Sequence, residues 1–509
     1  MKELSRTLNS LRNARVALFF SVILLGLNFF SRKVFIDCLS VDVLGLNTTA
    51  TNLFGFLNLA ELGISSAIAY TLYVPLYQRN YKEINEIVTV HGWLYRRIAY
   101  FVLIGGTILM CLFPWFFAKI NLPLWYAYGS FGVLLVAAML GYIINYKQII
   151  LSADQQEYKI TYNVQGFRCI KIFVQIIGIN FFFRGYVFWL IIELLFSVIT
   201  CFFLNKTIQK SYPWLLTNLS QGKILSKKYP QIKEKVKQIF FHRVSFYVLG
   251  QTSPLIIYLF LSLSDVAIYG NYILIIHGLL MLVNSIFNGI IPGVGNLVAE
   301  GDVVKIMSFF KQYTTLRFWL ASIICCGLYY LTTPFMILWV GREYLLEYNV
   351  FILIIFYAFI SMTRTNDTFL AAYGLFQDIW APVTEACINL FLSLLLGYYW
   401  GLTGIITGVL ISLLVIVCGW KPYFLYHSGF KSPMSSYVFL ICKLIILISL
   451  SYFIASISFS LFQENINSWF DLFLHAIKLV GLYAMISFFV FGIFSKDFRV
   501  VIHRFIAIM

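Results

Sequence analysis

Charged side chains inside long apolar runs are the residues of this sequence that could do chemistry. Five are basic and three are acidic, and each lies in a stretch long enough to cross a membrane: Arg32, Arg168, Lys171, Arg317, Arg364, Glu61, Asp367 and Glu385. Charges at membrane depth are costly, so they usually face a protein interior or a wet cavity. An excess of basic residues there attracts an anionic ligand, and the arginine fork suits phosphate oxygens.

Two pairs among these residues have the spacing of neighbours on one helical face. Arg168 and Lys171 are three residues apart, as are Arg364 and Asp367. The basic pair indicates a wet path through the membrane, with exposure to lipid as its alternative. The second pair either contacts a ligand or is a purely structural ion pair. Arg32 is expected in a cavity, with snorkelling to the outer interface as its alternative.

The composition shows which elements must position these charges. Hydrophobic residues make up 61% of the chain and charged residues only 11%, whereas a soluble domain has about 25% charged residues. The net charge of +16 is typical of a membrane protein whose cytoplasmic loops collect Lys and Arg, and a nucleic-acid partner is not expected. The nine cysteines form no CxxC pair, so no metal site is predicted. The sequence therefore predicts an all-α polytopic membrane protein.

About fourteen transmembrane helices are expected, with boundaries near 14–38, 43–77, 90–118, 122–151, 158–183, 185–205, 238–262, 265–299, 307–339, 345–373, 379–398, 401–423, 436–461 and 469–494. Alternate loops are rich in Lys and Arg, which predicts that both termini are cytoplasmic. The predicted domains are an N-lobe of helices 1–6 (1–205), a cytoplasmic basic amphipathic linker (206–237), a C-lobe of helices 7–12 (238–423) and two extra C-terminal helices with a tail (424–509).

The second predicted span, 43–77, is too long for one plain crossing and is interrupted by polar and small residues. It is expected to bend near Gly55 and Gly63, and Glu61 lies well inside it. A second long interrupted span, 265–300, follows the linker in a matching position. Two such spans in corresponding places indicate a duplicated fold with a substrate path between the halves.

Three stretches of the chain resemble one family. LFGFLNLAELGISSAIAYTLYVPL resembles the second-span signature of bacterial polysaccharide flippases in the multidrug/oligosaccharidyl-lipid/polysaccharide exporter superfamily. NVQGFRCIKIFVQ is similar to the fifth span of that family. The stretch that begins RTNDTFLAAYGLF resembles the tenth to twelfth spans, including the glycines Gly401, Gly404 and Gly408. The resemblance covers nearly the whole chain in order.

The resemblance implies two six-helix lobes around a central cavity, plus two C-terminal helices. It implies a flippase of the bacterial inner (cytoplasmic) membrane. The flippase would move undecaprenyl-pyrophosphate-linked oligosaccharide repeat units of O-antigen or capsule to the outer leaflet by alternating access, for surface polysaccharide biosynthesis. The coupling ion would be H⁺ or Na⁺, a polysaccharide polymerase would be a partner, and no cofactor is expected. The five deep basic residues would hold the anionic head group, and the three acidic residues would be charge partners or titrate.

Two other classes of function are weighed against this one. An ion-coupled drug or small-molecule antiporter of the same superfamily would keep buried acidic residues without nearby bases. A membrane polysaccharide polymerase or glycosyltransferase would show a long exported loop with catalytic charges. The sequence has no such loop and no DxD pair, so no enzyme and no catalytic residue is predicted.

Overall fold

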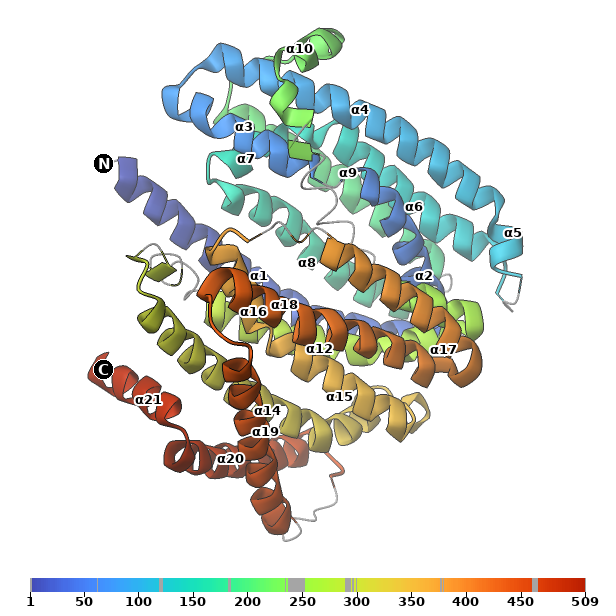
Figure 1. Cartoon of the computed structure of the whole chain (residues 1–509). Coiled ribbons are helices and arrows are strands. Elements are labelled where there is room, and N and C mark those ends of the chain that lie inside the picture. Colours follow the sequence, from blue (N-terminus) through green and yellow to red (C-terminus); the bar gives the residue numbers. More distant parts are fainter. Residues whose placement is uncertain are drawn as a thin grey trace. The chain divides into compact units, whose positions relative to one another are not determined.

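The computed structural model describes residues 2–61, 63–118, 122–181, 185–233, 235–236, 252–288, 294, 297–298, 300–375, 378, 380–459 and 466–508 (Figure 1). These residues are almost entirely helical, and eleven helices among them are long and apolar enough to cross a membrane. The prediction of an all-α polytopic membrane protein is therefore confirmed. The chain forms two compact units, Met1–Ala267 (unit 1) and Ile268–Met509 (unit 2).

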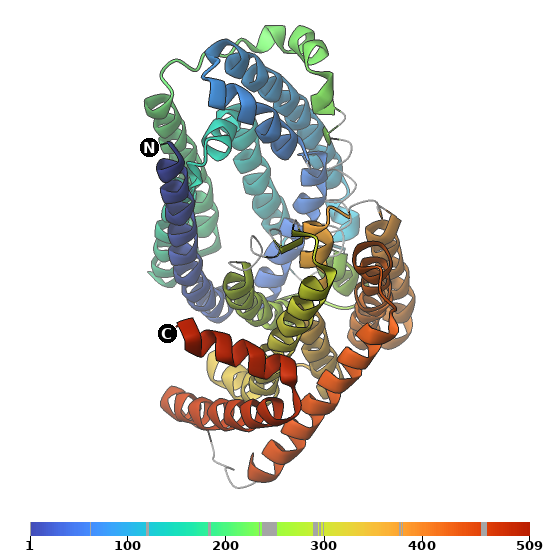
Figure 2. The ribbon, with the colours of Figure 1, turned by 60° about the vertical axis from the view of Figure 1, so that its left-hand side comes forward.

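Unit 1 is a bundle of long helices joined by short connections. Its helices are α1 (Lys2–Leu39), α2 (Val41–Leu57), η1 (Asn58–Glu61), α3 (Ile64–Gln78), α4 (Tyr81–Cys111), α5 (Phe113–Phe116), α6 (Trp125–Ile143), η2 (Asn145–Gln148), α7 (Ile149–Ala153), α8 (Glu157–Phe181), α9 (Gly185–Ser211), η3 (Leu219–Gln221), α10 (Gly222–Lys228) and the first residues of α12 (Leu263–Asn288). Figures 1 and 2 show α1 alongside α8, which packs against α9, while α4 packs against α6.

The predicted bend of the second span is a break between α2 and α3. The one-turn 3₁₀ helix η1 interrupts the span, and Gly63 follows it with φ of 90°, a conformation that glycine adopts readily. Gly55 lies within α2 and is helical, so the break lies at η1 and Gly63 rather than at Gly55. Glu61, the last residue of η1, therefore lies at the break itself.

Unit 2 is built around the long helix α14, which packs against α15, α19, α20 and α21. Its helices are the rest of α12, α14 (Val303–Trp339), η4 (Arg342–Tyr344), α15 (Tyr348–Met362), α16 (Thr365–Ala372), α17 (Trp380–Leu413), the π-helix η5 (Leu414–Trp420), α18 (Lys421–Phe424), the π-helix η6 (Leu425–Phe430), α19 (Ser435–Phe459), α20 (Trp469–Phe494) and α21 (Lys496–Ile508).

The continuous run named α17 contains a turn at Gly401, where φ is 55° and ψ is −134°. Two helices meet there at close range, since Ser393 Oγ donates a hydrogen bond of 3.0 Å to the carbonyl oxygen of Ile405. Among the eleven membrane-crossing helices, the run Trp380–Phe430 is counted once, and the broken second span (α2 and α3) is not counted. The predicted helix 238–262 and the last part of the predicted span 265–300 lie mostly outside the described residues. Separate counting of the two halves of Trp380–Phe430 and of the broken second span brings the described helices closer to the predicted number of about fourteen.

Gly404→Ala tests how close these two helices approach. A Cβ at position 404 would lie 2.0 Å from the carbonyl oxygen of Leu396, a contact that requires the backbone to move. We expect unfolding of the detergent-solubilised protein at a lower temperature, with a loss of about 1–3 kcal/mol. The control is Gly481→Ala on α20, which has nothing within 4 Å. Equal unfolding temperatures for both variants would contradict the close approach.

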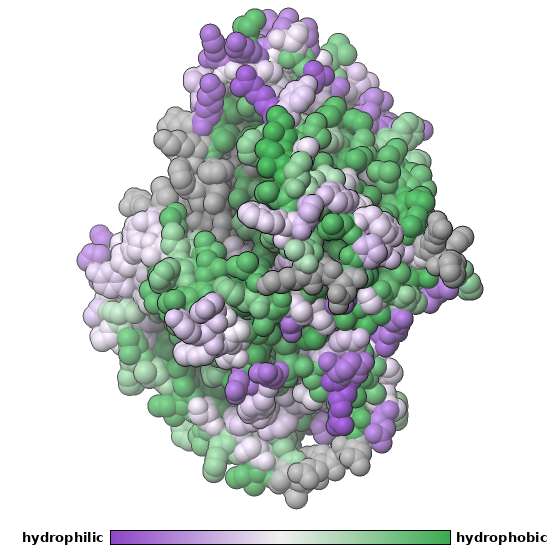
Figure 3. All heavy atoms as spheres, turned by 90° about the vertical axis from the view of Figure 1, so that its right-hand side faces the viewer, coloured by the Kyte–Doolittle hydropathy of each residue, from purple (hydrophilic) through white to green (hydrophobic). Residues whose placement is uncertain are grey.

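The surface of the helices agrees with a lipid environment. Large apolar side chains are exposed along most of the long helices, including Phe30, Phe181 and Phe439, which are 69%, 82% and 73% exposed. On the face seen in Figure 3, hydrophobic residues (green) cover wide areas, and hydrophilic residues gather at the end of unit 1 that carries α10. Such a large apolar surface indicates contact with membrane or protein rather than water.

Candidate functional site

A cavity of about 990 Å³ lies within unit 2, between α14, α15, α16, η5, α19 and α20. Most of its wall is apolar, with side chains such as Ile352, Phe356, Leu414, Ile445 and Phe453. A cavity of this size is at the upper end of the range for small-molecule sites. The two C-terminal helices, which lie beyond the predicted C-lobe, therefore supply part of its wall.

The charged residues of the cavity are gathered at one end. Arg364, Asn366 and Asp367 line it together with Tyr437, which accepts a hydrogen bond of 3.3 Å from the Asn366 side chain. Tyr452 lies on the same helix, α19, fifteen residues after Tyr437, which is about 22 Å further along the axis. The cavity is therefore amphipathic, with a charged end and a long apolar wall.

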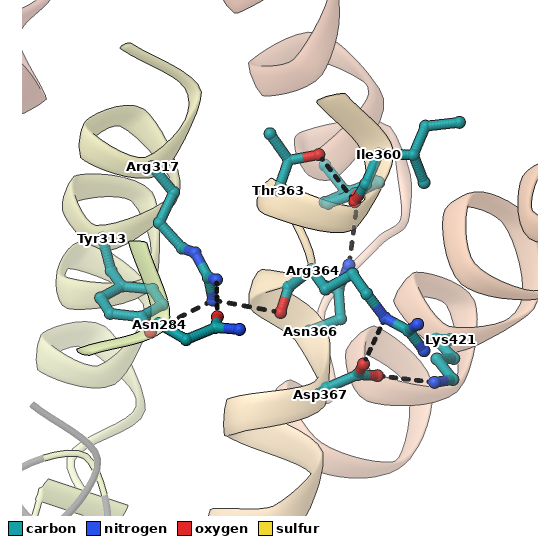
Figure 4. A network of polar contacts seen from close by, with 10 residues as sticks. Asn284, Tyr313, Arg317, Ile360, Thr363, Arg364, Asn366, Asp367 and Lys421 are labelled. Carbon is teal, nitrogen blue, oxygen red and sulfur yellow. Dashed lines mark hydrogen bonds and ion pairs between the residues drawn. The ribbon is translucent and has the colours of Figure 1, made fainter. Parts of the chain in front are cut away.

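Arg364 lies at the charged end because the chain breaks there. The residue caps α16 with ψ of 63°, between the end of α15 and the start of α16, where the sequence predicts one continuous span. Its Nε donates to Asp367 Oδ2 at 2.9 Å, and the Lys421 ammonium donates to Asp367 Oδ1 at 2.7 Å (Figure 4). The spacing in the sequence predicts the first of these contacts. Lys421 lies near the end of the predicted span 401–423, and only the structure brings its ammonium to Asp367.

The hydrogen bond to Asp367 occupies only one donor of the Arg364 side chain. Its two terminal nitrogens, Nη1 and Nη2, have no hydrogen-bond acceptor among the described residues of unit 2. A guanidinium carries five N–H donors in a planar fork that matches two oxygens of a phosphate. Arg364 therefore keeps donors available to an anion while Asp367 fixes its position.

Arg317 supports this end of the cavity from α14. Its Nη1 donates to the Arg364 carbonyl oxygen at 3.4 Å and its Nη2 to Asn284 Oδ1 at 3.2 Å (Figure 4). Its guanidinium carbon also lies 4.9 Å from the ring centroid of Phe287, within the range of a cation–π interaction. Arg317 is buried, and it contacts the main chain at the break between α15 and α16 rather than lining the cavity.

Glu385 on α17 is buried beside this cluster. It interacts electrostatically with Arg364, Lys421 and Asp367, and its Oε1 has no hydrogen-bond partner in the described part of the chain. Two carboxylates therefore stand near two bases. The sequence predicts an excess of positive charge among the deep residues. At this end of the cavity, however, these acidic and basic side chains are equal in number.

In unit 1 the structure pairs Lys171 with a residue that sequence reasoning missed. The Lys171 ammonium lies 2.5 Å from Glu193 Oε1, and Gln175 Nε2 donates to Glu193 Oε2 at 2.9 Å. The lysine and glutamate side chains are 19% and 16% exposed. The sequence feature that could have predicted this partner is the single glutamate within the apolar stretch of α9. Lys171 is thus neutralised between α8 and α9.

Glu193→Gln tests this pair. The substitution leaves the half-buried Lys171 without its carboxylate, and we expect a loss of about 3 kcal/mol in the free energy of unfolding. The double variant Lys171→Met/Glu193→Gln removes both charges and should recover most of that loss. Denaturant unfolding of the purified protein in detergent measures both. A double variant no more stable than the single one would contradict the pairing.

Arg32 and Arg168 lie elsewhere in unit 1. Arg32 Nη2 donates to the Ala267 carbonyl oxygen at 3.1 Å, which joins α1 to the start of α12, while the adjacent Lys33 pairs with Asp37 at 3.0 Å. Arg168 is exposed and forms no ion pair with a described carboxylate, so it does not share the environment of Lys171. Within unit 2, Arg317 therefore meets Arg364, whereas within unit 1 Arg32, Arg168 and Lys171 each have different surroundings.

Glu61 forms a polar contact at the break of the second span. It accepts a hydrogen bond from the Tyr95 hydroxyl and one of 3.4 Å from Ser65 Oγ, and Ser65 lies 2.5 Å from the Tyr95 hydroxyl. Tyr142 of α6 donates to Asn58 at 2.9 Å one turn away. Hydroxyl groups of α4 and α6 thus satisfy the polar side chains where the helix is interrupted.

Two solved structures have a similar fold. The lipid II flippase MurJ, in an inward closed conformation, aligns with 95% of this chain and 99% of its own chain, with a TM-score of 0.66 and 13% identity. An inward-facing multidrug resistance MATE family transporter of the MOP superfamily aligns with 82% of this chain and 99% of its own, with a TM-score of 0.58 and 14% identity. No protein-family profile and no curated protein sequence matches the chain. At these identities the likeness establishes that the chain shares the fold of these two structures and nothing finer.

Proposed function

We propose that this protein is a flippase that moves undecaprenyl-pyrophosphate-linked oligosaccharide repeat units from the inner to the outer leaflet. The observation that carries the proposal is the amphipathic cavity of unit 2, where an apolar wall ends at an arginine with two free terminal nitrogens. A lipid-linked pyrophosphate has the same two parts, an apolar chain and an anionic head. Charge and polarity therefore match along the length of the cavity.

The head group would bind at Arg364. Its terminal nitrogens would donate to the pyrophosphate oxygens. Asp367, itself held by the Lys421 ammonium, would keep the guanidinium in place. Arg317 would fix the main chain at the break, acting as a positioning residue. The remaining predicted residues Arg32, Arg168 and Lys171 would meet the head group at other stages of transport, and Glu61 or Glu385 would titrate.

The fold of the neighbouring structures supports transport rather than catalysis. One neighbour is named as a lipid II flippase and the other as a multidrug resistance transporter. A lipid-linked substrate for this chain agrees with the apolar cavity. We place the protein in the cytoplasmic membrane with both termini in the cytoplasm, with alternating access driven by H⁺ or Na⁺ and a polysaccharide polymerase as the next protein in the process.

The second candidate function is an ion-coupled drug antiporter, and one observation favours it. Glu385 is a buried carboxylate with an unpartnered oxygen, the kind of group that a proton-coupled exporter of cations requires. Against it, Lys421 and Arg364 stand beside both acidic residues at this end of the cavity. A cationic drug would therefore meet two bases, and the flippase fits the site better.

The test is transport by the purified protein in liposomes. A fluorescent undecaprenyl-pyrophosphate oligosaccharide is placed in both leaflets, and a membrane-impermeant quencher reports the accessible fraction over time. We expect the accessible fraction to rise towards complete quenching with the protein and to stop near half without it. A fluorescent phosphatidylcholine in the same liposomes is the control for general scrambling. Efflux of ethidium with no movement of the oligosaccharide lipid would contradict the proposal and support the antiporter.

A further inference from the structure

The helix α4 of unit 1 carries two basic residues that the proposed function does not use. Arg96 and Arg97 are adjacent and exposed, although α4 is apolar enough to cross a membrane. The guanidinium carbon of Arg97 lies 4.1 Å from the ring centroid of Trp93. Neither arginine forms an ion pair with a carboxylate that the structure describes. Both charges are therefore available to an external anion.

The linker is packed on the same stretch of α4. Gly222, the first residue of α10, lies so close to Trp93 that a Cβ at position 222 would be 2.3 Å from the Trp93 Cβ. In the same way, a Cβ at position 92 would lie 2.5 Å from Leu219 Cδ2. The basic linker is thus placed directly next to the side chain on which Arg97 is stacked.

Polar contacts also fix the linker to α4, about two turns before Trp93. Asn85 Oδ1 accepts a hydrogen bond of 3.2 Å from the Leu216 backbone N–H. Glu86 accepts from the Tyr229 hydroxyl at 2.7 Å and pairs with the Lys228 ammonium at 2.5 Å. The carboxylate of Glu86 is therefore already neutralised by the linker, and it does not offset the positive charge of the arginines.

The outer side of the linker combines positive charge with exposed apolar side chains. Lys223 and Lys227 are exposed on α10, and Ile224 between them is 72% exposed. Leu216, which precedes α10, is 75% exposed. This pairing of lysines with exposed aliphatic residues is typical of segments that lie in the head-group region of a membrane.

We propose that Trp93, Arg96, Arg97, Lys223 and Ile224 form a binding surface for the head groups of anionic phospholipids, named here the α4–α10 surface. The two arginines offer forks to phosphate oxygens, and the lysines add positive charge near the membrane plane. Tryptophan is enriched at the membrane–water interface, where one side of its ring is apolar. Because α4 itself crosses the membrane, phospholipid head groups lie beside this surface without any further docking step.

The test uses the full-length protein in a neutral detergent with a short-chain fluorescent phosphatidylglycerol, and fluorescence anisotropy measures binding. The double variant Arg96→Gln/Arg97→Gln is expected to weaken binding by about fivefold for each charge removed, or about 25-fold in total. Arg342→Gln removes an exposed arginine of unit 2 and should leave binding unchanged. The pair Lys223→Gln/Lys227→Gln on the exposed side of α10 gives a second measurement if the arginine variant fails to fold.

Two comparisons identify the ligand. A fluorescent phosphatidylcholine should bind at least tenfold more weakly than phosphatidylglycerol, and inorganic phosphate should displace the lipid poorly because it lacks an apolar part. Wild-type affinity in both double variants would overturn the proposal, as would equal binding of the two lipids. Displacement by inorganic phosphate as effective as that by unlabelled phosphatidylglycerol would also overturn it, since the surface would then be a phosphate site.

Discussion

Replacement of Arg364 by alanine is expected to reduce export of the lipid-linked oligosaccharide by more than tenfold while the protein still reaches the membrane. The variant loses both terminal nitrogens of a residue that lines the cavity, and neither nitrogen has an acceptor among the described residues of unit 2. A hydrogen bond to a charged group contributes about 1.5–3 kcal/mol, so the loss of two exceeds the 1.4 kcal/mol that corresponds to a factor of ten. Surface glycan on intact cells, relative to protein in the membrane fraction, measures the effect.

Arg364→Lys separates anion binding from structural pairing. Lysine keeps a positive charge beside Asp367, so the unfolding temperature should stay close to that of the wild type, but it lacks the fork. We expect the lysine variant to fold normally and still to export poorly. Wild-type export by the alanine variant would exclude Arg364 as the head-group anchor, and full export by the lysine variant would reduce its role to charge alone.

A tryptophan in the apolar wall of the cavity is expected to give the second large effect. Ser449 lies on α19 and lines the cavity, so Ser449→Trp would fill space that the lipid chain needs. We expect export to fall by about tenfold or more, with little change in the amount of folded protein. Quantification of surface glycan measures this loss, together with size-exclusion chromatography of the purified variant.

The matched control for this substitution lies one turn away on the same helix. Ile446 is 64% exposed and does not line the cavity, so Ile446→Trp adds the same ring towards the outside of the protein. It should export like the wild type. Equal export by both variants would show that the cavity of unit 2 is not occupied during transport, and equal loss in both would point to a general defect of α19.

Much of the fold follows from the sequence because the hydrophobic pattern of membrane helices is strong. The break of the second span could also be predicted, since Gly63 and the polar residues around Glu61 weaken the helix there. The break at Arg364 could not, because no glycine or proline marks it. The boundary between the predicted spans 379–398 and 401–423 lies next to Gly401, where the structure has its turn.

The candidate site was harder to predict for a physical reason. An i, i+3 spacing shows that Arg364 and Asp367 are neighbours, but it does not show what faces them from other helices. Lys421 and Glu193 come from distant parts of the chain, and only the packing of α18 and α9 brings them to Asp367 and Lys171. The cavity itself depends on α19 and α20, to which the sequence assigned no function.

The most direct test of lipid-linked oligosaccharide transport is to determine which leaflet holds the lipid-linked repeat units in a strain without this protein. An added glycosidase, applied first to intact spheroplasts and then to opened vesicles, distinguishes the two faces of the membrane. We predict complete repeat units that resist the enzyme until the cytoplasmic face is exposed, and that become accessible again when the wild-type gene is restored. Complete units that the enzyme cleaves in intact spheroplasts of the deletion strain would contradict the flippase function.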